Sequence, residues 1–257
     1  MKTVVLKFGG AAVANPKRFE QIAEIICQKC EEYQRVVVVV SAMANMTDEL
    51  LGLANQVHPS PPKRELDMLV SVGERISMSL LAMALDVKGK QAVSLTGSQA
   101  GIVTTPQHAE ARIIDVRPLR LIRLLEQGKI VIVAGFQGVS REGEITTLGR
   151  GGSDTTAVAL AIALGAEKVE FYKDVLGIYA EDPKKNPNAA FFSSLDYTEA
   201  LEILKRGAKV LQSRCVELAA KHRVPLHVLP FADPGLPGTL IGNIPRALIH
   251  ELTYEDA

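Results

Sequence analysis

The sequence predicts an α/β sandwich with a parallel or mostly parallel central sheet. Short β-rich runs alternate along the chain with helical patterns, and short turns that contain glycine join them. Residues 36–40 are consecutive valines, which is typical of a strand buried on both faces of a parallel sheet. With 257 residues, the chain can bury a large core, either as one unit or as two lobes.

The strands are short runs rich in apolar and β-branched residues, bounded by glycine, proline or charged residues. They are expected at residues 3–8, 35–41, 91–95, 129–136, 168–172 and 226–229. Residues 137–147 are expected to form a β-hairpin, because the charged segment 141–144 contains a glycine that suits its tip. Residues 58–63, which are rich in proline, form an irregular connection.

The helices are indicated by apolar residues that recur three or four positions apart. Asn15-Pro16 is expected to be the N-cap and first residue of a helix that carries Phe19, Ile22 and Ile26 at this spacing. Further helices are expected from about residue 47 and at 66–85, 118–126, 153–164, 199–204 and 213–222.

The residues that close the predicted strands carry most of the candidate chemistry. Ligands of open α/β sheets bind beyond the carboxyl ends of the strands. Lys7-Phe8-Gly9-Gly10 places a cation and a flexible backbone there, as in a phosphate cradle, although the Walker P-loop spacing is absent. The alternative is a turn with a solvated lysine. Four more strands end in glycine, hydroxyl-bearing or charged residues, at 41–42, 96–97, 135–136 and 173–174.

Residues 147–156 form a glycine-rich stretch that runs into an apolar helical pattern. Three glycines in four positions would let the backbone approach a ligand closely. Ser153, Asp154 and Thr155 are good helix-start residues, so we expect free N–H groups there. Arg150 suits a planar anion, carboxylate or phosphate, bound through two nitrogens. The alternative is a glycine-rich turn with a surface ion pair between Arg150 and Asp154.

Three other features are candidates with equally plain structural alternatives. Lys209 is either a second cation of the site or an ordinary surface lysine. The charged loop after residue 172 could flank a nucleotide through Tyr179 and Lys184, or be an ordered turn around Asp182-Pro183. Glu74, within an apolar helix, is either the anchor of a substrate ammonium group or a salt-bridged helix carboxylate.

Composition and charge exclude several classes of protein. The 29 basic and 29 acidic residues balance, which argues against a general binder of nucleic acid or membrane surfaces. The three cysteines are too few for a disulfide scaffold, and Cys27 and Cys30 are expected to be ordinary helix thiols. The five histidines show no metal spacing and are expected to be structural or exposed. No leader and no apolar run long enough to cross a bilayer is recognised, so we expect a cytoplasmic protein.

A series of motifs spans the chain from residue 7 to about residue 240. In order, they are Lys7-Phe8-Gly9-Gly10, Val39-Val40-Ser41-Ala42, Gly73-Glu74, Thr96-Gly97-Ser98-Gln99-Ala100-Gly101, Val133-Ala134-Gly135-Phe136-Gln137-Gly138, the stretch 147–156, residues 174–179 with Asp182-Pro183, and Gly207-Ala208-Lys209-Val210-Leu211. In this order they resemble the motifs of the aspartate kinases, a branch of the amino acid kinase superfamily.

The resemblance implies a three-layer αβα sandwich with a mostly parallel sheet, and one catalytic domain over residues 1–257. It implies an acceptor lobe over about 1–165, a nucleotide lobe over about 166–245 and a short C-terminal stub at 246–257. The implied reaction is the transfer of the γ-phosphoryl group of ATP, with Mg²⁺, to the β-carboxylate of L-aspartate. The product, 4-phospho-L-aspartate, leads to lysine, threonine, methionine and diaminopimelate. A homodimer joined through the acceptor lobe is also implied.

The same resemblance assigns roles by motif position. Lys7 and Lys209 would neutralise the transferring phosphoryl group, and Asp154 would organise both lysines and the Mg²⁺-nucleotide. Aspartate would be held by Ser41, Thr47, Glu74, Arg150 and Ser153, with Glu74 near its ammonium group and Arg150 on a carboxylate. The nucleotide would contact Lys7, Gly9, Gly10, Lys173, Asp174, Tyr179, Asp182, Lys184 and Lys209. No residue is assigned as a metal ligand.

The chain departs from the family pattern at several positions. Ala11-Ala12 stands where Thr-Ser is usual, Lys173 where Thr is usual, Lys184 where Arg is usual, and Gln212-Ser213 where His-Pro is usual. The sequence also stops at Ala257, where aspartate kinases usually continue into ACT-type regulatory domains. This is expected of either a short, unregulated enzyme or a separately made catalytic piece. Two alternatives stay open: a superfamily kinase for another acceptor, and a catalytically silent nucleotide-binding subunit.

Overall fold

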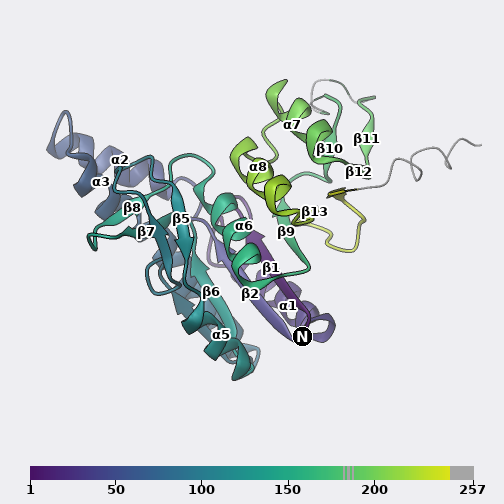
Figure 1. The fold of residues 1–257 in the computed structure, drawn as a ribbon, viewed down its shortest axis with the longest axis horizontal. Helices are drawn as coiled ribbons and strands as arrows, with labels where there is room; N and C mark the ends of the chain where they lie inside the picture. Colours follow the sequence, from purple (N-terminus) through teal and green to yellow (C-terminus); the bar gives the residue numbers. More distant parts are fainter. Residues whose placement is uncertain (182, 184–185, 187, 244–257) are drawn as a thin grey trace, which may run out of the picture.

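An eight-stranded sheet forms the centre of the computed structural model, which describes residues 1–181, 183, 186 and 188–243 (Figure 1). Its strands lie in the order β12-β14-β13-β9-β1-β2-β6-β3, and all neighbours are parallel except β13 and β14. The strands are β1 (Thr3–Phe8), β2 (Arg35–Val40), β3 (Ala92–Leu95), β6 (Ile130–Ala134), β9 (Lys168–Lys173), β12 (Ser194–Leu195), β13 (Leu226–Pro230) and β14 (Thr239–Ile241). The mostly parallel sheet predicted from the sequence is confirmed.

Helices cover both faces of this sheet, which confirms the three-layer αβα sandwich. Alternate residues of each strand point to opposite faces. Val36, Val38 and Val40 therefore pack on one side with α1 (Arg18–Glu32) and α4 (Val72–Val87). Val37 and Val39 pack on the other side of the sheet, in a core that four further helices cover. These helices are α5 (Leu119–Glu126), α6 (Gly152–Leu164), α7 (Tyr197–Lys205) and α8 (Ser213–His222).

Two smaller sheets lie outside the central one. The predicted hairpin is present as β7 (Gln137–Ser140) and β8 (Ile145–Thr147), which are antiparallel. It continues into a four-stranded sheet with β4 (Ile102–Thr104) and β5 (Ile113–Val116), which sequence analysis missed. The two-residue strands β10 (Ile178–Tyr179) and β11 (Phe191–Phe192), which form the other sheet, were also missed. Strands of two to four residues are too short to show a period.

Two predicted helix boundaries are wrong. The chain does not enter α1 at Pro16: the Asn15 side chain accepts a hydrogen bond from the Lys17 N–H, and the helix begins at Arg18. Such a local side-chain bond competes with helix geometry. The predicted helix 66–85 is two helices, α3 (Lys63–Val70) and α4, which meet at Ser71. The helix expected from about residue 47 is α2 (Met46–Val57).

The segment Lys63–Val87 meets, by length and composition, the criterion for a membrane span, contrary to the expectation from the sequence. A helix in the core of a protein can have the same length and composition. Here Met78, Leu81 and Leu85 pack in the core beside α1, and the helix is interrupted at Ser71, between α3 and α4.

A buried carboxylate links β9 to α1, on the face of the sheet that α1 covers. Glu170, in β9, is fully buried and lies 2.8 Å from Lys168 Nζ and 3.3 Å from Lys29 Nζ. The Tyr172 hydroxyl donates a third contact to it, at 2.8 Å. Burial opposes its ionisation, but the hydrogen bond and charge of Lys168, followed by Lys29, outweigh burial and hold the pKa of Glu170 below its usual value.

We expect Glu170→Gln to lower the free energy of unfolding at pH 7 by about 3 kcal/mol, because two lysines lose their buried anion. Since the folded pKa is depressed, this stabilisation is present above the unfolded pKa, about 4.3, and is lost as pH falls through the folded pKa. Urea unfolding should therefore show the gap between the two proteins narrowing below about pH 4. Glu202→Gln, on an exposed face of α7, is the matched control; an equal effect of both changes would contradict the assignment.

Candidate active site

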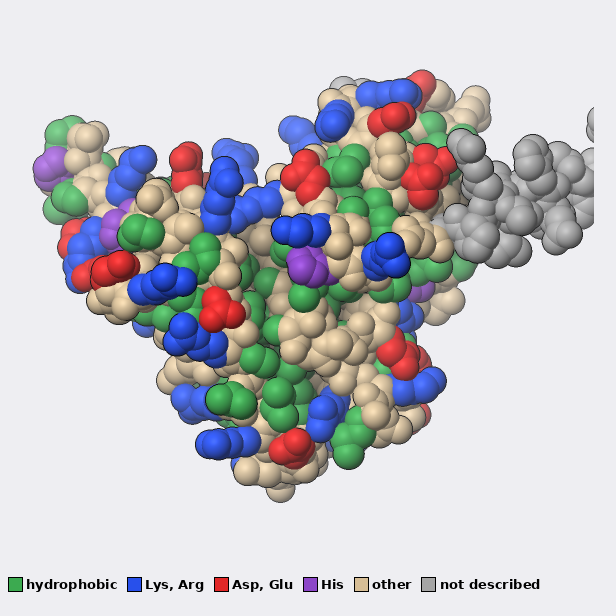
Figure 2. All heavy atoms as spheres, viewed as in Figure 1, with side chains coloured by type: hydrophobic (Ala, Val, Ile, Leu, Met, Phe, Trp, Pro, Cys, Tyr) green, Lys and Arg blue, Asp and Glu red, His purple; other side chains and the backbone are tan. Residues whose placement is uncertain are grey.

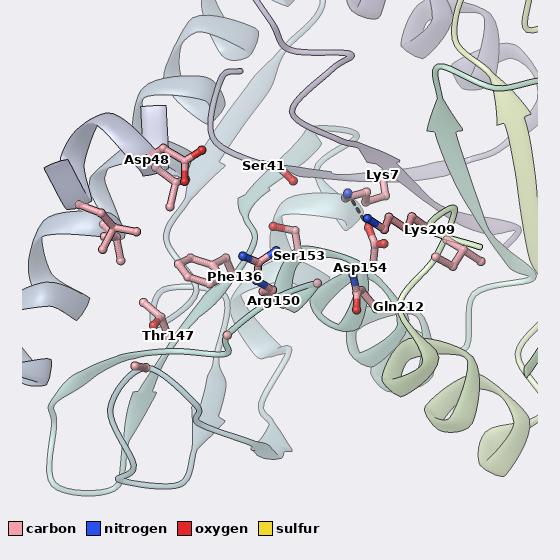
Figure 3. Close-up of a pocket in the computed structure, with 18 of the residues that line it drawn as sticks. Lys7, Ser41, Asp48, Phe136, Thr147, Arg150, Ser153, Asp154, Lys209 and Gln212 are labelled. Atoms are coloured by element: carbon pink, nitrogen blue, oxygen red, sulfur yellow. Dashed lines mark ion pairs between the residues drawn. The ribbon is translucent and has the colours of Figure 1, made fainter. Parts of the chain in front are cut away.

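A cavity of about 540 Å³ opens at the carboxyl edge of the sheet (Figure 3). Its wall is built from the ends of β1, β2 and β9, from α2 and α3, from the start of α6, and from the segment before α8. Figure 2 shows lysine and arginine side chains around the notch between the α2–α3 arm and the α7–α8 region. Eight predicted site residues line the cavity: Lys7, Ser41, Thr47, Arg150, Ser153, Asp154, Lys173 and Lys209.

The floor of the cavity holds one carboxylate between two ammonium groups. Lys7 Nζ lies 2.5 Å from Asp154 Oδ1, and Lys173 Nζ lies 3.1 Å from Asp154 Oδ2. Lys7 and Asp154 are both 4% exposed, and the Lys173 side chain is 16% exposed. Burial opposes ionisation of Asp154, but the charges of Lys173 and Lys7 outweigh it and hold the pKa of Asp154 below its usual value.

The local sequence explains how these groups meet. Lys7 faces the same side of β1 as Val5, toward α6, and Asp154 lies in the first turn of that helix. Gly151 caps α6 with a φ of +73°, a conformation that side chains other than glycine rarely adopt. A Cβ atom on Gly151 would also overlap the Gln212 side chain. The missing side chain of Gly151 therefore allows a left-handed turn and a close contact with Gln212. The sequence predicted only that it would let a ligand approach.

The wall around Arg150 differs from one expectation. Arg150 is exposed and forms no ion pair with Asp154, so the surface ion pair considered from the sequence is wrong. Instead Asp154 faces the lysines, and Arg150 lies near Ser153 in the same wall (Figure 3). Phe136 also lines the cavity and was given no role from the sequence. It has a positive φ of +68°, at the point where β6 turns toward β7.

Glu74 lies just behind this wall and does not line the cavity. Its side chain is buried, and Oε1 accepts a hydrogen bond from the Ala42 N–H at 3.1 Å. Within the described part of the chain, Oε2 has no hydrogen-bond partner, so the salt-bridged alternative is not found. Burial raises the pKa of Glu74 to about 7, although the Ala42 hydrogen bond and the charge of Lys7 act against it.

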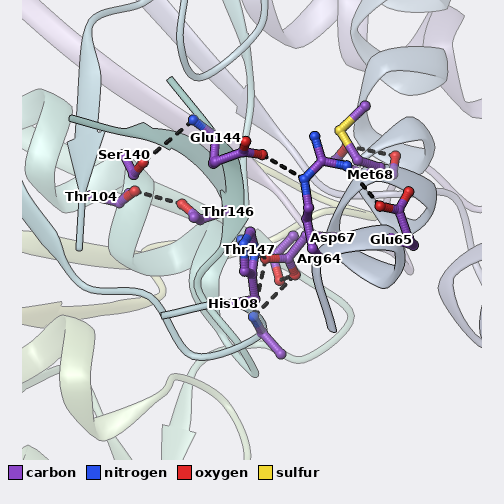
Figure 4. Close-up of polar contacts among 12 residues, drawn as sticks. Arg64, Glu65, Asp67, Met68, Thr104, His108, Ser140, Glu144, Thr146 and Thr147 are labelled. Atoms are coloured by element: carbon purple, nitrogen blue, oxygen red, sulfur yellow. Dashed lines mark hydrogen bonds and ion pairs between the residues drawn. The ribbon is translucent and has the colours of Figure 1, made fainter. Parts of the chain in front are cut away.

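Another buried carboxylate, Asp67 in α3, joins separate segments of the chain beside the cavity (Figure 4). It is 1% exposed and accepts hydrogen bonds from the Thr147 N–H and hydroxyl, the Ala109 N–H and the His108 ring. These donors come from two separate segments, one of which leads directly into the Arg150 loop. Sequence analysis missed Asp67, because its partners are 41 to 80 residues away along the chain. His108 is structural, as expected.

The predicted nucleotide residues are only partly brought together. Gly9 lies beside the Lys7 ammonium, since a Cβ atom there would come 3.3 Å from Lys7 Nζ. Lys209 lines the cavity and is exposed. Four predicted nucleotide residues are not part of the cavity wall: Gly9, Gly10, Asp174 and Tyr179. The Tyr179 ring packs edge-on against Phe191. Asp182 and Lys184 lie outside the described residues.

Among the residues that the structure describes, no group of three or more His, Cys, Asp or Glu side chains could hold a metal ion. Cys27, Cys30 and Cys215 are free thiols, as expected of helix cysteines. A metal in this cavity would therefore take most of its ligands from phosphate and water, with Asp154 as a carboxylate within the wall.

The raised pKa of Glu74 should make the free energy of unfolding depend on pH. A carboxyl group whose folded pKa lies near 7 binds its proton more tightly in the folded state, so stability falls as pH rises from about 4.5 to 7, by about 3 kcal/mol. Glu74→Gln should remove this decline, as measured by urea unfolding at pH 5, 6, 7 and 8. Glu31→Gln, on the exposed face of α1, should leave it unchanged. An unaltered slope in Glu74→Gln would contradict the assignment.

Comparisons with known proteins place the chain in a family. The profile of the amino acid kinase family matches residues 2–230. An aspartokinase of Mycolicibacterium smegmatis is 51% identical over 259 residues, covering all of this chain and 60% of that protein. An aspartate kinase structure from Synechocystis is 43% identical with a TM-score of 0.83, covering 95% of this chain and 40% of that one. E. coli aspartokinase III, solved with aspartate and ADP, is 28% identical with a TM-score of 0.86, covering 95% of this chain and 65% of that one. The chain thus spans less than two thirds of these relatives, and it belongs to the amino acid kinase family.

Proposed function

We propose that the chain carries the catalytic part of an aspartate kinase, which transfers the γ-phosphoryl group of ATP to the β-carboxylate of L-aspartate. The observation that carries the proposal is the convergence of Lys7, Lys173, Lys209 and Arg150 in one cavity around Asp154. The identity of about one half to aspartokinases supports this acceptor over those of other family members. A place in the synthesis of lysine and related amino acids, in the cytoplasm, goes with this proposal.

The cavity suits a reaction between two anions. A carboxylate acceptor is already ionised at pH 7, so no general base is required. The obstacle is repulsion between the acceptor and the phosphates, which fixed positive charges reduce while they position both groups. Lys7 is held rigid by Asp154 and by its place in a central strand, so little reorganisation accompanies the reaction.

The acceptor would lie between the α2–α3 arm and the Arg150 loop. Arg150 would take the α-carboxylate through two nitrogens, and the hydroxyl groups of Ser41, Thr47 and Ser153 offer further hydrogen bonds. Glu74 lies behind the cavity wall, and within the described residues its Oε2 atom has no hydrogen-bond partner. The ammonium group of the amino acid would have to pass the wall to reach this atom, and would then convert Glu74 to its ionised form. Residues 1–165 would thus form the acceptor lobe.

The nucleotide would enter from the side of residues 166–245. Lys209 lies on that side of the wall, in the segment before α8. Gly9, beside the Lys7 ammonium group, leaves the end of β1 without a side chain, where a phosphate would approach the backbone. The Cβ position of Gly10 lies against the backbone of Ala42, and a nucleotide contact from Gly10 stays a prediction. Mg²⁺ bound with ATP would neutralise part of the phosphate charge, and Asp154, one of the carboxylates in the cavity wall, would help to orient it. Contacts from Asp174, Tyr179, Asp182 and Lys184 stay predictions.

The proposal predicts ADP release that depends on L-aspartate, with hydroxylamine trapping the acyl phosphate as a hydroxamate. Glutamate, acetylglutamate and UMP should give no comparable rate. Lys7→Ala should keep the fold, measured by circular dichroism, yet lose about 10²–10³ in turnover, as expected for the loss of a preorganised charge. Arg18→Ala, on a helix end outside the cavity, should retain full activity.

Each contrary outcome identifies a different alternative. ADP release only with another acceptor would move the chain to a different branch of the family. Nucleotide binding without turnover on any acceptor would indicate a silent subunit. Near-normal turnover of Lys7→Ala would contradict the catalytic role of Lys7.

We also propose a homodimer joined through the acceptor lobe. One face of α4 exposes Val72, Ile76, Met83 and Val87, which recur at helical spacing, and Met68 of α3 extends this face. An apolar stripe of this kind is typical of an interface between proteins. The stripe belongs to residues 1–165 and lies outside the cavity wall.

Sedimentation equilibrium should therefore give twice the mass of the chain. Ile76→Glu should shift the equilibrium to monomer, because a charge at a buried interface is left unpaired. Leu119→Glu, at an apolar position on α5 that is more exposed than Ile76, is the control and should stay dimeric. A monomer at all concentrations, or an unaffected dimer in Ile76→Glu, would contradict this interface.

A further inference from the structure

Lys173 stands at a position to which the family resemblance assigns a nucleotide contact but where Thr is usual, so its ammonium group is a feature of this chain. It is the last residue of β9, and its ammonium group reaches Asp154 Oδ2 at 3.1 Å, while Lys7 occupies Oδ1 at 2.5 Å. One carboxylate therefore faces two ammonium groups, so the cluster carries a net charge of +1. Without Lys173, Lys7 and Asp154 would form a neutral pair.

The two lysines differ in how firmly they are held. The Lys7 side chain is 6% exposed and makes the shorter contact, whereas that of Lys173 is 16% exposed and makes the longer one. Both line the cavity. Lys209 and Arg150 are also in the wall but are exposed, where water and salt screen their charges more strongly. Lys173 is thus the half-buried cation that can leave its partner for an entering anion.

The strand pairing shows which part of the cavity Lys173 serves. Phe8 of β1 is paired with Tyr172 of β9, so Lys173 ends its strand beside Gly9. That corner is the glycine end of β1, followed by Ala11 and Ala12, which offer no hydroxyl groups to a ligand. At this corner, the residues that follow β1 offer a ligand only backbone groups, and Lys173 of β9 supplies a charged side chain.

We propose that Lys173 is a phosphate-binding residue, which exchanges Asp154 for a β- or γ-phosphate oxygen of a nucleoside di- or triphosphate. Lys7 stays paired with Asp154 during this exchange and keeps the carboxylate from being left buried without a partner. The inference rests on the proposed function only in that the cavity binds a nucleotide; it does not depend on which acceptor is used.

Calorimetric titration of the whole chain with ATP, ADP and AMP, in Mg²⁺ and without an acceptor, tests the exchange. Lys173→Thr should weaken ATP and ADP binding about 10- to 100-fold, the effect of losing a hydrogen bond to a charged group. AMP binding should change less than about twofold, since AMP lacks those phosphates. Lys173→Arg, which keeps the charge, should retain most of the affinity for ATP.

Two controls separate this role from a structural one. Lys168→Thr removes a lysine from the other end of β9, where it pairs with Glu170, and should leave all three affinities unchanged. Lys173→Gln, which keeps most of the side-chain stem, should reproduce Lys173→Thr if the latter folds poorly. Thermal unfolding of each variant shows whether the fold is retained.

Each result decides the matter. Unchanged ATP and ADP affinities in Lys173→Thr and Lys173→Gln would contradict phosphate binding by Lys173. Its role would then be limited to the ion pair with Asp154. Equal weakening of AMP would show that the effect is not exerted through the β- and γ-phosphates. Failure of the unaltered chain to bind any nucleotide would overturn both proposals, whereas nucleotide binding without turnover of aspartate would overturn only the proposed acceptor.

Discussion

The rest of the site depends on the pairing of Lys7 with Asp154 at the floor of the cavity. An isolated charge buried to this degree would be neutralised by a pKa shift, so each group requires the other to stay ionised. The pair joins a central strand to the first turn of α6. It therefore fixes the position of that helix, and of the Arg150 loop before it, relative to the carboxyl edge of the sheet.

Three other buried carboxylates show how burial and partners divide structural from chemical roles. Glu170 is surrounded by two lysines and a tyrosine hydroxyl, and its pKa is lowered. Asp67 receives hydrogen bonds from two distant segments and acts as a tie between them. Among these carboxylates, within the described residues, Glu74 alone retains an oxygen with neither a hydrogen bond nor an ion pair, and its pKa is raised. A buried acid with spare capacity is the one suited to a ligand.

The glycines of the loop before α6 show why a motif predicts a place more reliably than a mechanism. Three glycines in four positions were expected to admit a ligand. In the structure, Gly151 has a left-handed conformation, and its missing Cβ atom makes room for Gln212. Gly152 likewise makes room for Leu148, since a Cβ atom would come 2.7 Å from the Leu148 Cβ. The loop forms one part of the cavity wall, and the space that its missing side chains leave is filled by Gln212 and Leu148.

The sequence by itself determined the sandwich, the order of its main helices and strands, and the edge at which the site forms. Runs of valine and helical spacing are local signals, and the carboxyl ends of parallel strands meet at one edge whatever residues they carry. Only the tertiary structure decided that Asp154 faces Lys7 and Lys173 rather than Arg150, that Asp67 belongs to the site, and that Glu74 lies behind the wall. These are contacts between residues far apart in the chain, and a side chain's partner and degree of burial depend on how the layers pack rather than on its neighbours in sequence.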